Sequence, residues 1–105
     1  MKPETKFQKK VLSDLKKLSN VWILKTQERA RKGVPDILLC CNGTFVALEL
    51  KSSAKSKISP LQKFEINYIQ ACGGLGWIVH PDNWGQIYTR IKDISCQIEY
   101  NALPT

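Results

Sequence analysis

The dipeptide Asn42-Gly43 is the feature that most constrains the fold, because it lies between two strongly apolar segments. Residues 35–41 and 44–51 are rich in aliphatic side chains. Asn-Gly is the preferred pair of a two-residue type I′ turn, in which both central residues need a positive φ. We therefore predict an antiparallel hairpin whose register is fixed by this turn.

The predicted register places two acidic side chains opposite each other at the open end of the hairpin. Counting back from the turn, Asp36 faces Glu49, with Cβ atoms ~5 Å apart, and Lys51 shares the face of Glu49. Facing like charges are destabilising. A bulge, a register slip or a salt bridge from Lys51 would relieve the repulsion. Alternatively, the two carboxylates share a divalent cation.

The other segments predict an α/β fold with the order α-β-β-β-α-β-α. A helix is expected over 3–18, a strand over 21–26, a basic loop over 27–33, a strand over 76–80 and a last helix over 84–94, capped near Asp82 or Asn83. The helix after residue 59 connects the third and fourth strands, which permits a parallel crossover. We expect one domain over residues 1–105, with a central mixed sheet flanked by helices.

The start of the middle helix has a specific signature. Ser59-Pro60-Leu61-Gln62 supplies the N-cap, the N1 proline and the N3 glutamine of a capping box. Gly73-Gly74 is expected to end the helix. Its predicted apolar face consists of Leu61, Phe64, Tyr68, Ile69 and Cys72.

Positive charge is concentrated in the first part of the chain. The net charge is +7, and 14 of the 16 basic residues but only five of the nine acidic residues lie in residues 1–63. This distribution favours a polyanion such as nucleic acid as a partner, although Lys-rich helices are often simply solvated. No apolar run is long enough for a membrane span and no signal peptide is found, so we expect a cytoplasmic protein without a membrane partner.

The cysteine pattern does not predict a structural zinc site. The four cysteines contain no C-x-x-C pair and the chain has a single histidine. We expect Cys40, Cys41, Cys72 and Cys96 to be core or near-core thiols in a reducing cytosol. We also expect His80 and the three tryptophans to have packing roles, and we assign no catalysis to His80.

A divalent ion beside a lysine on a positive face suits phosphodiester hydrolysis. Such an ion binds a scissile phosphate oxygen, lowers the pKa of an attacking water and neutralises developing charge. Lys51 is ordinarily protonated. We therefore expect it to orient water and stabilise charge rather than to act as a base.

The spacing of these residues resembles the PD-(D/E)xK nuclease superfamily, and in particular the virus-type replication-repair nuclease (VRR-NUC) family. The similarity rests on Gly33-Val34-Pro35-Asp36, on Glu49-Leu50-Lys51 thirteen residues later and on Ser59-Pro60-Leu61-Gln62, and it extends from about Glu4 to the last helix. The resemblance implies a restriction-endonuclease-like αβββαβ core, dependence on Mg²⁺ or Mn²⁺, and endonuclease action on branched or flapped DNA. Small stand-alone members of the viral type are homodimers that resolve four-way junctions, so it also implies a homodimer.

The resemblance also assigns roles to individual residues. Asp36 and Glu49 match the metal ligands, with the Leu50 carbonyl as a third, and Lys51 matches the catalytic lysine. Gln62 matches an active-site glutamine, while its position equally fits the capping box. Glu4 matches an acidic residue of the first helix; it shares a stripe with Phe7 and Val11, which favours an inward direction, but it lies where helices fray.

Basic residues around this centre are candidates for phosphate contacts that position DNA without reading its sequence. They are Lys6, Lys9, Lys10, Arg29, Arg31, Lys32, Lys55 and Lys57.

Three functions remain open from the sequence. A metal-dependent DNA endonuclease, cutting four-way junctions, flaps or nicked duplex, is favoured because two facing carboxylates would repel phosphate in a simple binder. The alternatives are a non-catalytic DNA-binding module on the same fold and a protein whose basic face binds an acidic protein. Trp22, Trp84 and the C-terminal tail are the candidates for a dimer interface.

Overall fold

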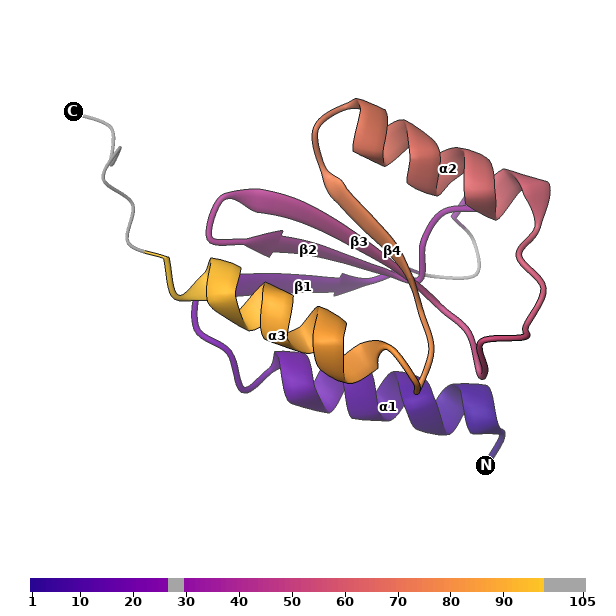
Figure 1. The fold of residues 1–105 in the computed structure, drawn as a ribbon, viewed down its shortest axis with the longest axis horizontal. Helices are drawn as coiled ribbons and strands as arrows, with labels where there is room; N and C mark the ends of the chain where they lie inside the picture. The colour runs from indigo at the N-terminus through magenta and orange to yellow at the C-terminus, as the bar shows by residue number, and fades with distance from the viewer. Residues whose placement is uncertain (27–29, 98–105) are drawn as a thin grey trace.

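The described part of the chain folds as three helices around a four-stranded mixed sheet, as the sequence predicted (Figure 1). The computed structural model describes residues 1–26 and 30–97. Strands pair in the order β1-β2-β3-β4; the first three are antiparallel, and β4 is parallel to β3. The elements are α1 (Pro3–Leu15), β1 (Val21–Lys25), β2 (Ile37–Cys41), β3 (Thr44–Leu50), α2 (Pro60–Ala71), β4 (Leu75–Val79) and α3 (Trp84–Ser95).

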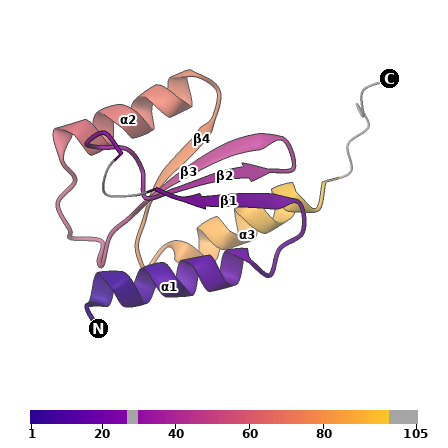
Figure 2. The same cartoon turned by 180° about the vertical axis from the view of Figure 1, so that it is seen from behind.

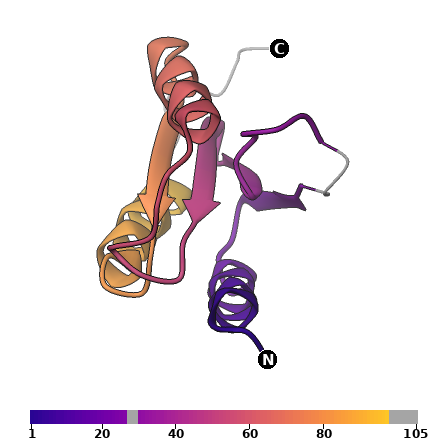
Figure 3. The ribbon, with the colours of Figure 1, turned by 90° about the vertical axis from the view of Figure 1, so that its right-hand side faces the viewer.

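The helices are distributed unequally over the two faces of the sheet. Helices α1 and α3 cover one face, and α2 lies on the other, over β3 and β4 (Figures 2 and 3). The main core fills the space between the sheet and the α1–α3 pair, and the Trp84 indole N–H joins these two helices by donating to Asp14 Oδ2 at 2.8 Å. The core side chains of α1 and α3 are Phe7, Val11, Leu15, Trp84, Ile87, Ile91 and Ile94.

The hairpin turn and its register are confirmed. Asn42 and Gly43 have φ values of 48° and 87°, as a type I′ turn requires. The ladder runs from Cys41 opposite Thr44 back to Ile37 opposite Leu48. The next facing pair along the two strands is therefore Asp36 and Glu49.

Several predicted details are wrong. Helix α1 ends at Leu15 rather than at residue 18, although Leu18 still packs against the core. Asn83 is the N-cap residue of α3, as predicted, but its side chain makes no capping hydrogen bond; its Oδ1 accepts from the His80 amide at 2.9 Å. None of the described helices is long and apolar enough to cross a membrane.

The predicted apolar face of α2 is not the face that contacts the sheet. Ile66 is buried and Ile69 half-buried, whereas Leu61, Phe64 and Tyr68 are exposed. The contact with the sheet determines which side of α2 is buried. Gly76 of β4 has no side chain, so Ile66 packs closely against it; a Cβ at Gly76 would lie 3.4 Å from the Ile66 side chain.

The prediction for the cysteines is right only for Cys41, which is buried in the core; Cys40, Cys72 and Cys96 are exposed. Successive strand residues point to opposite faces, so Cys40 points away from the core that holds Cys41. Cys72 and Cys96 follow the last turns of α2 and α3. Trp22 also departs from its predicted packing role, since 60% of its surface is exposed.

Candidate metal centre

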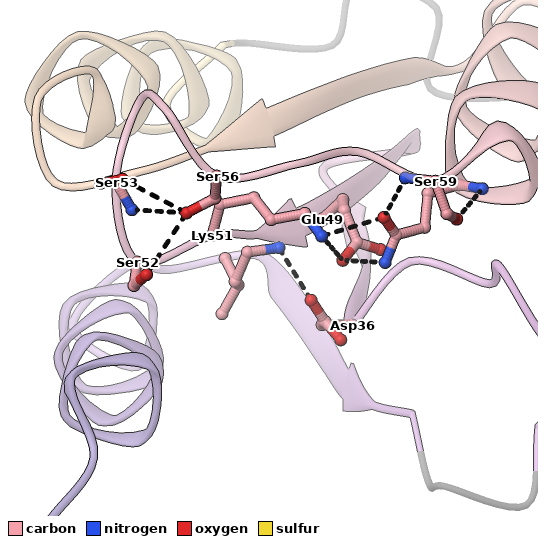
Figure 4. Close-up of polar contacts among 9 residues, drawn as sticks. Asp36, Glu49, Lys51, Ser52, Ser53, Ser56 and Ser59 are labelled. Carbon is pink, nitrogen blue, oxygen red and sulfur yellow. Dashed lines mark hydrogen bonds and ion pairs between the residues drawn. The ribbon is translucent and has the colours of Figure 1, made fainter.

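The two predicted acids meet at the end of the hairpin opposite the turn (Figure 4). Asp36 immediately precedes β2, and its Oδ2 accepts a hydrogen bond from the Leu50 amide at 2.8 Å. The side chain thus links β2 to β3 one residue beyond the backbone ladder. Glu49 lies within β3 and is only 3% exposed, which is unusual for a carboxylate.

Burial and the neighbouring acid raise the pKa of Glu49 to about 8. Loss of hydration is the largest cause, followed by the charge and the hydrogen bonding of Asp36; the Lys51 ammonium opposes the shift, and Glu4 adds to it slightly. A bulge or a register slip would have separated the two carboxyls. Their mutual influence therefore agrees with the register predicted from the turn.

Lys51 and Gln62 complete a hydrogen-bonded group around Glu49. The Lys51 amide donates to the Val79 carbonyl at 2.8 Å, which fixes the lysine beside β4. Its Nζ donates to Gln62 Oε1 at 2.9 Å and lies 3.9 Å from Glu49 Oε2. Gln62 Nε2 in turn donates to the same Glu49 oxygen at 3.2 Å.

Gln62 caps helix α2 and also contacts Lys51 and Glu49. Its side-chain Oε1 accepts from the Ser59 backbone amide at 2.9 Å, and the Gln62 backbone amide donates to Ser59 Oγ at 3.1 Å. These two bonds close the capping box. The same Oε1 accepts from Lys51. The capping role and the contact with the acid and the lysine are therefore compatible, because the capping box holds the side-chain amide of Gln62 where it contacts Lys51 and Glu49.

Glu4 lies in the first turn of α1 and its side chain is exposed, unlike the buried Phe7 and Val11 with which it shares a stripe. Phe7 and Val11 are buried one and two turns further along. Glu4 affects Glu49 through its charge, and its catalytic role stays a prediction.

The predicted phosphate-binding residues occupy three places. Lys6, Lys9 and Lys10 are exposed on α1, where Lys10 pairs with Asp14 at 3.3 Å. Lys32, Lys55 and Lys57 are exposed in loops on either side of the centre. Arg29 lies outside the described residues.

Arg31 pairs with Glu65 within the chain, and its contact with phosphate stays a prediction. Its guanidinium donates two hydrogen bonds to the carboxylate of Glu65 on α2, at 2.8 and 3.1 Å. The Glu65 carboxylate raises the pKa of Arg31, and Arg31 lowers the pKa of Glu65. The pair fastens the loop that leads into Asp36 to the helix that carries Gln62. In the sequence Arg31 stands among basic residues, which suggested a DNA contact. Its partner Glu65 lies 34 residues further along the chain, so local charge could not reveal the pairing.

A cluster of serines in the loop after Lys51 was not predicted. The Ser56 hydroxyl lies 3.3 Å from the hydroxyls of Ser52 and Ser53 and accepts from the Ser53 amide at 3.2 Å (Figure 4). These contacts hold the loop that carries Lys55 and Lys57 in a compact turn. The only signal in the sequence is the alternation of serine and lysine.

Gly33 allows the loop before Asp36 to lie against α2. Its φ is +88°, and a Cβ there would lie 2.8 Å from the backbone of Leu61. Gly33→Ala is expected to lower the free energy of unfolding by about 1–3 kcal/mol, since alanine disfavours this φ and the helix backbone has no room. Gly85→Ala is the matched control, because Gly85 is helical with nothing within 4 Å of an added Cβ. Urea denaturation should find this control neutral or stabilising; equal losses in both variants would contradict the account.

The donor set fits a hard divalent cation such as Mg²⁺ or Mn²⁺. Among residues 1–26 and 30–97, no group of three or more His, Cys, Asp or Glu side chains surrounds a common point. Asp36 and Glu49 are the two carboxylates that would hold such a cation. Mg²⁺ commonly uses one or two carboxylates and completes its shell with water and substrate phosphate. The Leu50 carbonyl remains the predicted backbone ligand.

The fold and the centre together define an α/β protein with two acids, a lysine and a glutamine at one end of a mixed sheet. Among solved structures, a "VRR_NUC domain protein" has a similar fold, with a TM-score of 0.74 and 16% identity over 90% of this chain and 91% of that chain. A second, titled "VRR_NUC domain", has a TM-score of 0.68 and 20% identity over 90% and 95%. Sequence comparison finds no matching family model and no match among curated proteins. The chain therefore has the fold of VRR_NUC domain proteins.

Proposed function

We propose that this protein is a DNA endonuclease that depends on Mg²⁺ or Mn²⁺. The observation that carries the proposal is the placement of a nearly fully buried Glu49 against Asp36, with Lys51 and Gln62 bound to each other beside it. Two acids at one point destabilise a fold unless something positive joins them. The likeness to VRR_NUC domain structures supports a nuclease fold. The facing acids favour a nuclease over a binding module on that fold, because two carboxylates would repel phosphate in a simple binder.

Each residue of the centre has a distinct part in the proposed reaction. Asp36 and Glu49 would hold the cation, which when bound polarises the phosphate and acidifies water. Lys51 would place its ammonium against the charge that develops on the phosphate oxygens. Gln62 fixes the Lys51 ammonium through Oε1 and the Glu49 carboxylate through Nε2, which keeps both groups oriented before DNA arrives.

The proposed substrate is branched DNA, with four-way junctions favoured over flaps and nicked duplex. Labelled four-way, flapped, nicked and linear DNA should be incubated with the protein, with and without Mg²⁺ or Mn²⁺. We expect metal-dependent cutting, with paired symmetric nicks in the four-way substrate. Cutting confined to flaps or nicks would reject the junction preference alone. Salt-sensitive binding without cutting of any substrate would identify a DNA-binding module instead.

The loop lysines and Arg31 should differ in their effect on DNA binding. Each phosphate contact adds about one unit to the slope of log affinity against log salt. Lys55→Ala with Lys57→Ala is expected to reduce this slope by about 2 and to weaken binding to all substrates. Arg31→Ala should leave the slope unchanged, because the guanidinium is already occupied by Glu65. Fluorescence anisotropy titrations at several salt concentrations measure both, and a larger loss for Arg31→Ala would refute the assignment.

A further inference from the structure

The half of the sheet formed by β1 and β2 has an open face that carries exposed aromatic rings. Trp22 pairs with Cys40 and Cys40 with Phe45, so the three side chains lie in one row across three strands. Trp22 is 60% and Phe45 45% exposed. Helix α2 packs against β3 and β4 and leaves this row uncovered in the described part of the chain (Figure 3).

Two further rings on α2 stand beside this row. Phe64 and Tyr68 are each 57% exposed, and their rings meet edge to face with centroids 5.7 Å apart. A cavity of about 280 Å³ lies where the helix meets the sheet, lined by Phe45 on β3 and by Tyr68 and Ile69 on α2. The four exposed rings and this cavity form one surface, which we call the aromatic step. Apolar groups exposed together in this way mark a binding surface.

The cavity offers both aromatic walls and a polar edge. Phe45 and Tyr68 present rings, and the Arg31–Glu65 pair lines the same cavity. This pair uses two of the five N–H donors of the arginine, and the carboxylate oxygens can each accept a further bond. Rings beside hydrogen-bonding groups without net charge match a nucleobase, which stacks through its faces and bonds through its edge. The volume, just below the ~300–1,000 Å³ of drug-sized pockets, suits such a small planar group.

The charge around the aromatic step favours a polyanion over a protein partner. The segments that form the step, residues 21–25, 30–35, 37–45 and 60–71, contain four basic residues and one acid, Glu65, whose charge Arg31 balances. Lys32 follows Arg31, Lys63 precedes Phe64, and both lysines are exposed. Proteins bind single-stranded nucleic acid with this combination, because cations contact the backbone while aromatic rings stack on the bases.

The aromatic step lies on the same side of the sheet as the proposed metal centre. Phe45 and Glu49 are four residues apart on β3, so they point to the same face, about 13 Å apart at the rise of a strand. That distance corresponds to about four stacked nucleotides at ~3.4 Å each. Helix α2 borders both places, since Gln62 contacts Glu49 and Tyr68 lines the cavity. A strand held at the step would therefore reach the centre.

We propose that the aromatic step binds unpaired bases of a DNA strand, with one base in the cavity against Phe45 and Tyr68 and another on Trp22. That this strand belongs to the substrate of a nuclease rests on the proposed function. Unpairing costs least for bases that are mismatched or already single-stranded. A flap supplies such bases directly, and the last base pairs of an open branch point lack a stacked neighbour. The step would hold these bases while the adjoining phosphates lie at the centre.

Strands that differ only in their bases test the proposal without metal and without cutting. Fluorescence anisotropy would compare a labelled oligothymidylate with an abasic strand of the same length and charge. We expect the native protein to bind the oligothymidylate on the order of 10-fold more tightly, since each stacked base adds affinity. Equal affinity for the two strands would overturn the proposal and leave the surface to a protein partner. Because metal is absent, this result does not depend on whether the protein cuts DNA.

Two substitutions at one position separate stacking from simple apolar contact. Tyr68→Leu keeps an apolar side chain but removes the ring, so it should weaken oligothymidylate binding on the order of 10-fold and leave binding of the abasic strand unchanged. Tyr68→Phe is the matched control, because it keeps the ring and should bind as the native protein does. Tyr68 is largely exposed, so both variants should keep the native melting temperature. Equal binding by all three proteins would contradict the placement of a base in the cavity.

Tryptophan fluorescence reports on the other end of the step. Trp77 and Trp84 pack in the core, whereas Trp22 is exposed. A base stacked on Trp22 should therefore quench the fluorescence of the native protein when oligothymidylate is added, and the abasic strand should not. Trp22→Phe should bind with nearly native affinity but without the quenching. Quenching that persists in this variant, or no quenching in the native protein, would refute the path of the strand across β1.

Discussion

The Asp36→Asn variant is expected to lose DNA cleavage, with a fall in the single-turnover rate on the order of 10³-fold. The variant keeps a side-chain oxygen that can accept from the Leu50 amide, so the end of the hairpin should stay closed. What it loses is one of the two charges that would hold the cation, and the cation is expected to supply several kcal/mol of charge stabilisation. DNA affinity measured without metal should be at least as tight, since one repulsive charge is gone.

The same substitution should have the opposite effect on the stability of the metal-free protein. Glu49 is buried beside Asp36, whose charge disfavours its ionisation. Neutralising Asp36 removes that repulsion, so the melting temperature without metal should rise or stay level. Asp93→Asn is the matched control, because Asp93 is exposed on α3, which covers the opposite face of the sheet. Near-native cleavage by Asp36→Asn would remove the basis for the proposed nuclease.

Local chemistry explains why the approach of Asp36 to Glu49 could be predicted from the sequence. The positive φ of Asn42 and Gly43 is an intrinsic preference of these residues, and it fixes the register that brings Asp36 to Glu49. The capping box is equally local, since Ser59 and Gln62 satisfy each other's amides within one turn. Features set within a few residues were therefore predictable.

The features that were missed depend on contacts between distant segments. The second role of Gln62 requires the distance between α2 and β3, and the pairing of Arg31 with Glu65 requires the packing of the loop on the helix. Periodicity identified an apolar stripe on α2, but Ile66 rather than Phe64 faces the sheet. A sequence pattern gives a helix an apolar side without saying which partner covers it.

The raised pKa of Glu49 predicts that the metal-free protein becomes less stable as the pH rises. The unfolded chain releases this proton near 4.5, whereas the folded protein holds it until about 8. The folded state therefore gains stability that is complete below pH 4.5 and lost as the pH passes through 8. Integrated over this window, the effect is on the order of a few kcal/mol. The melting temperature without metal should fall steadily across this range.

Mn²⁺ or Mg²⁺ should reverse this trend, because the cation replaces the proton between the two carboxylates and binds more tightly as the pH rises. Thermal melts between pH 5 and about 9, with and without metal, measure both effects. Glu49→Gln should flatten the metal-free profile and remove the gain from metal. Glu65→Gln is the control. Arg31 lowers the pKa of Glu65. The stability that this carboxylate provides is therefore lost only as the pH falls below the ordinary pKa of a glutamate. That variant should therefore keep the native slope and the native response to metal. A metal-free profile that is flat or rises with pH in the native protein would show that Glu49 is not held in its neutral form beside Asp36.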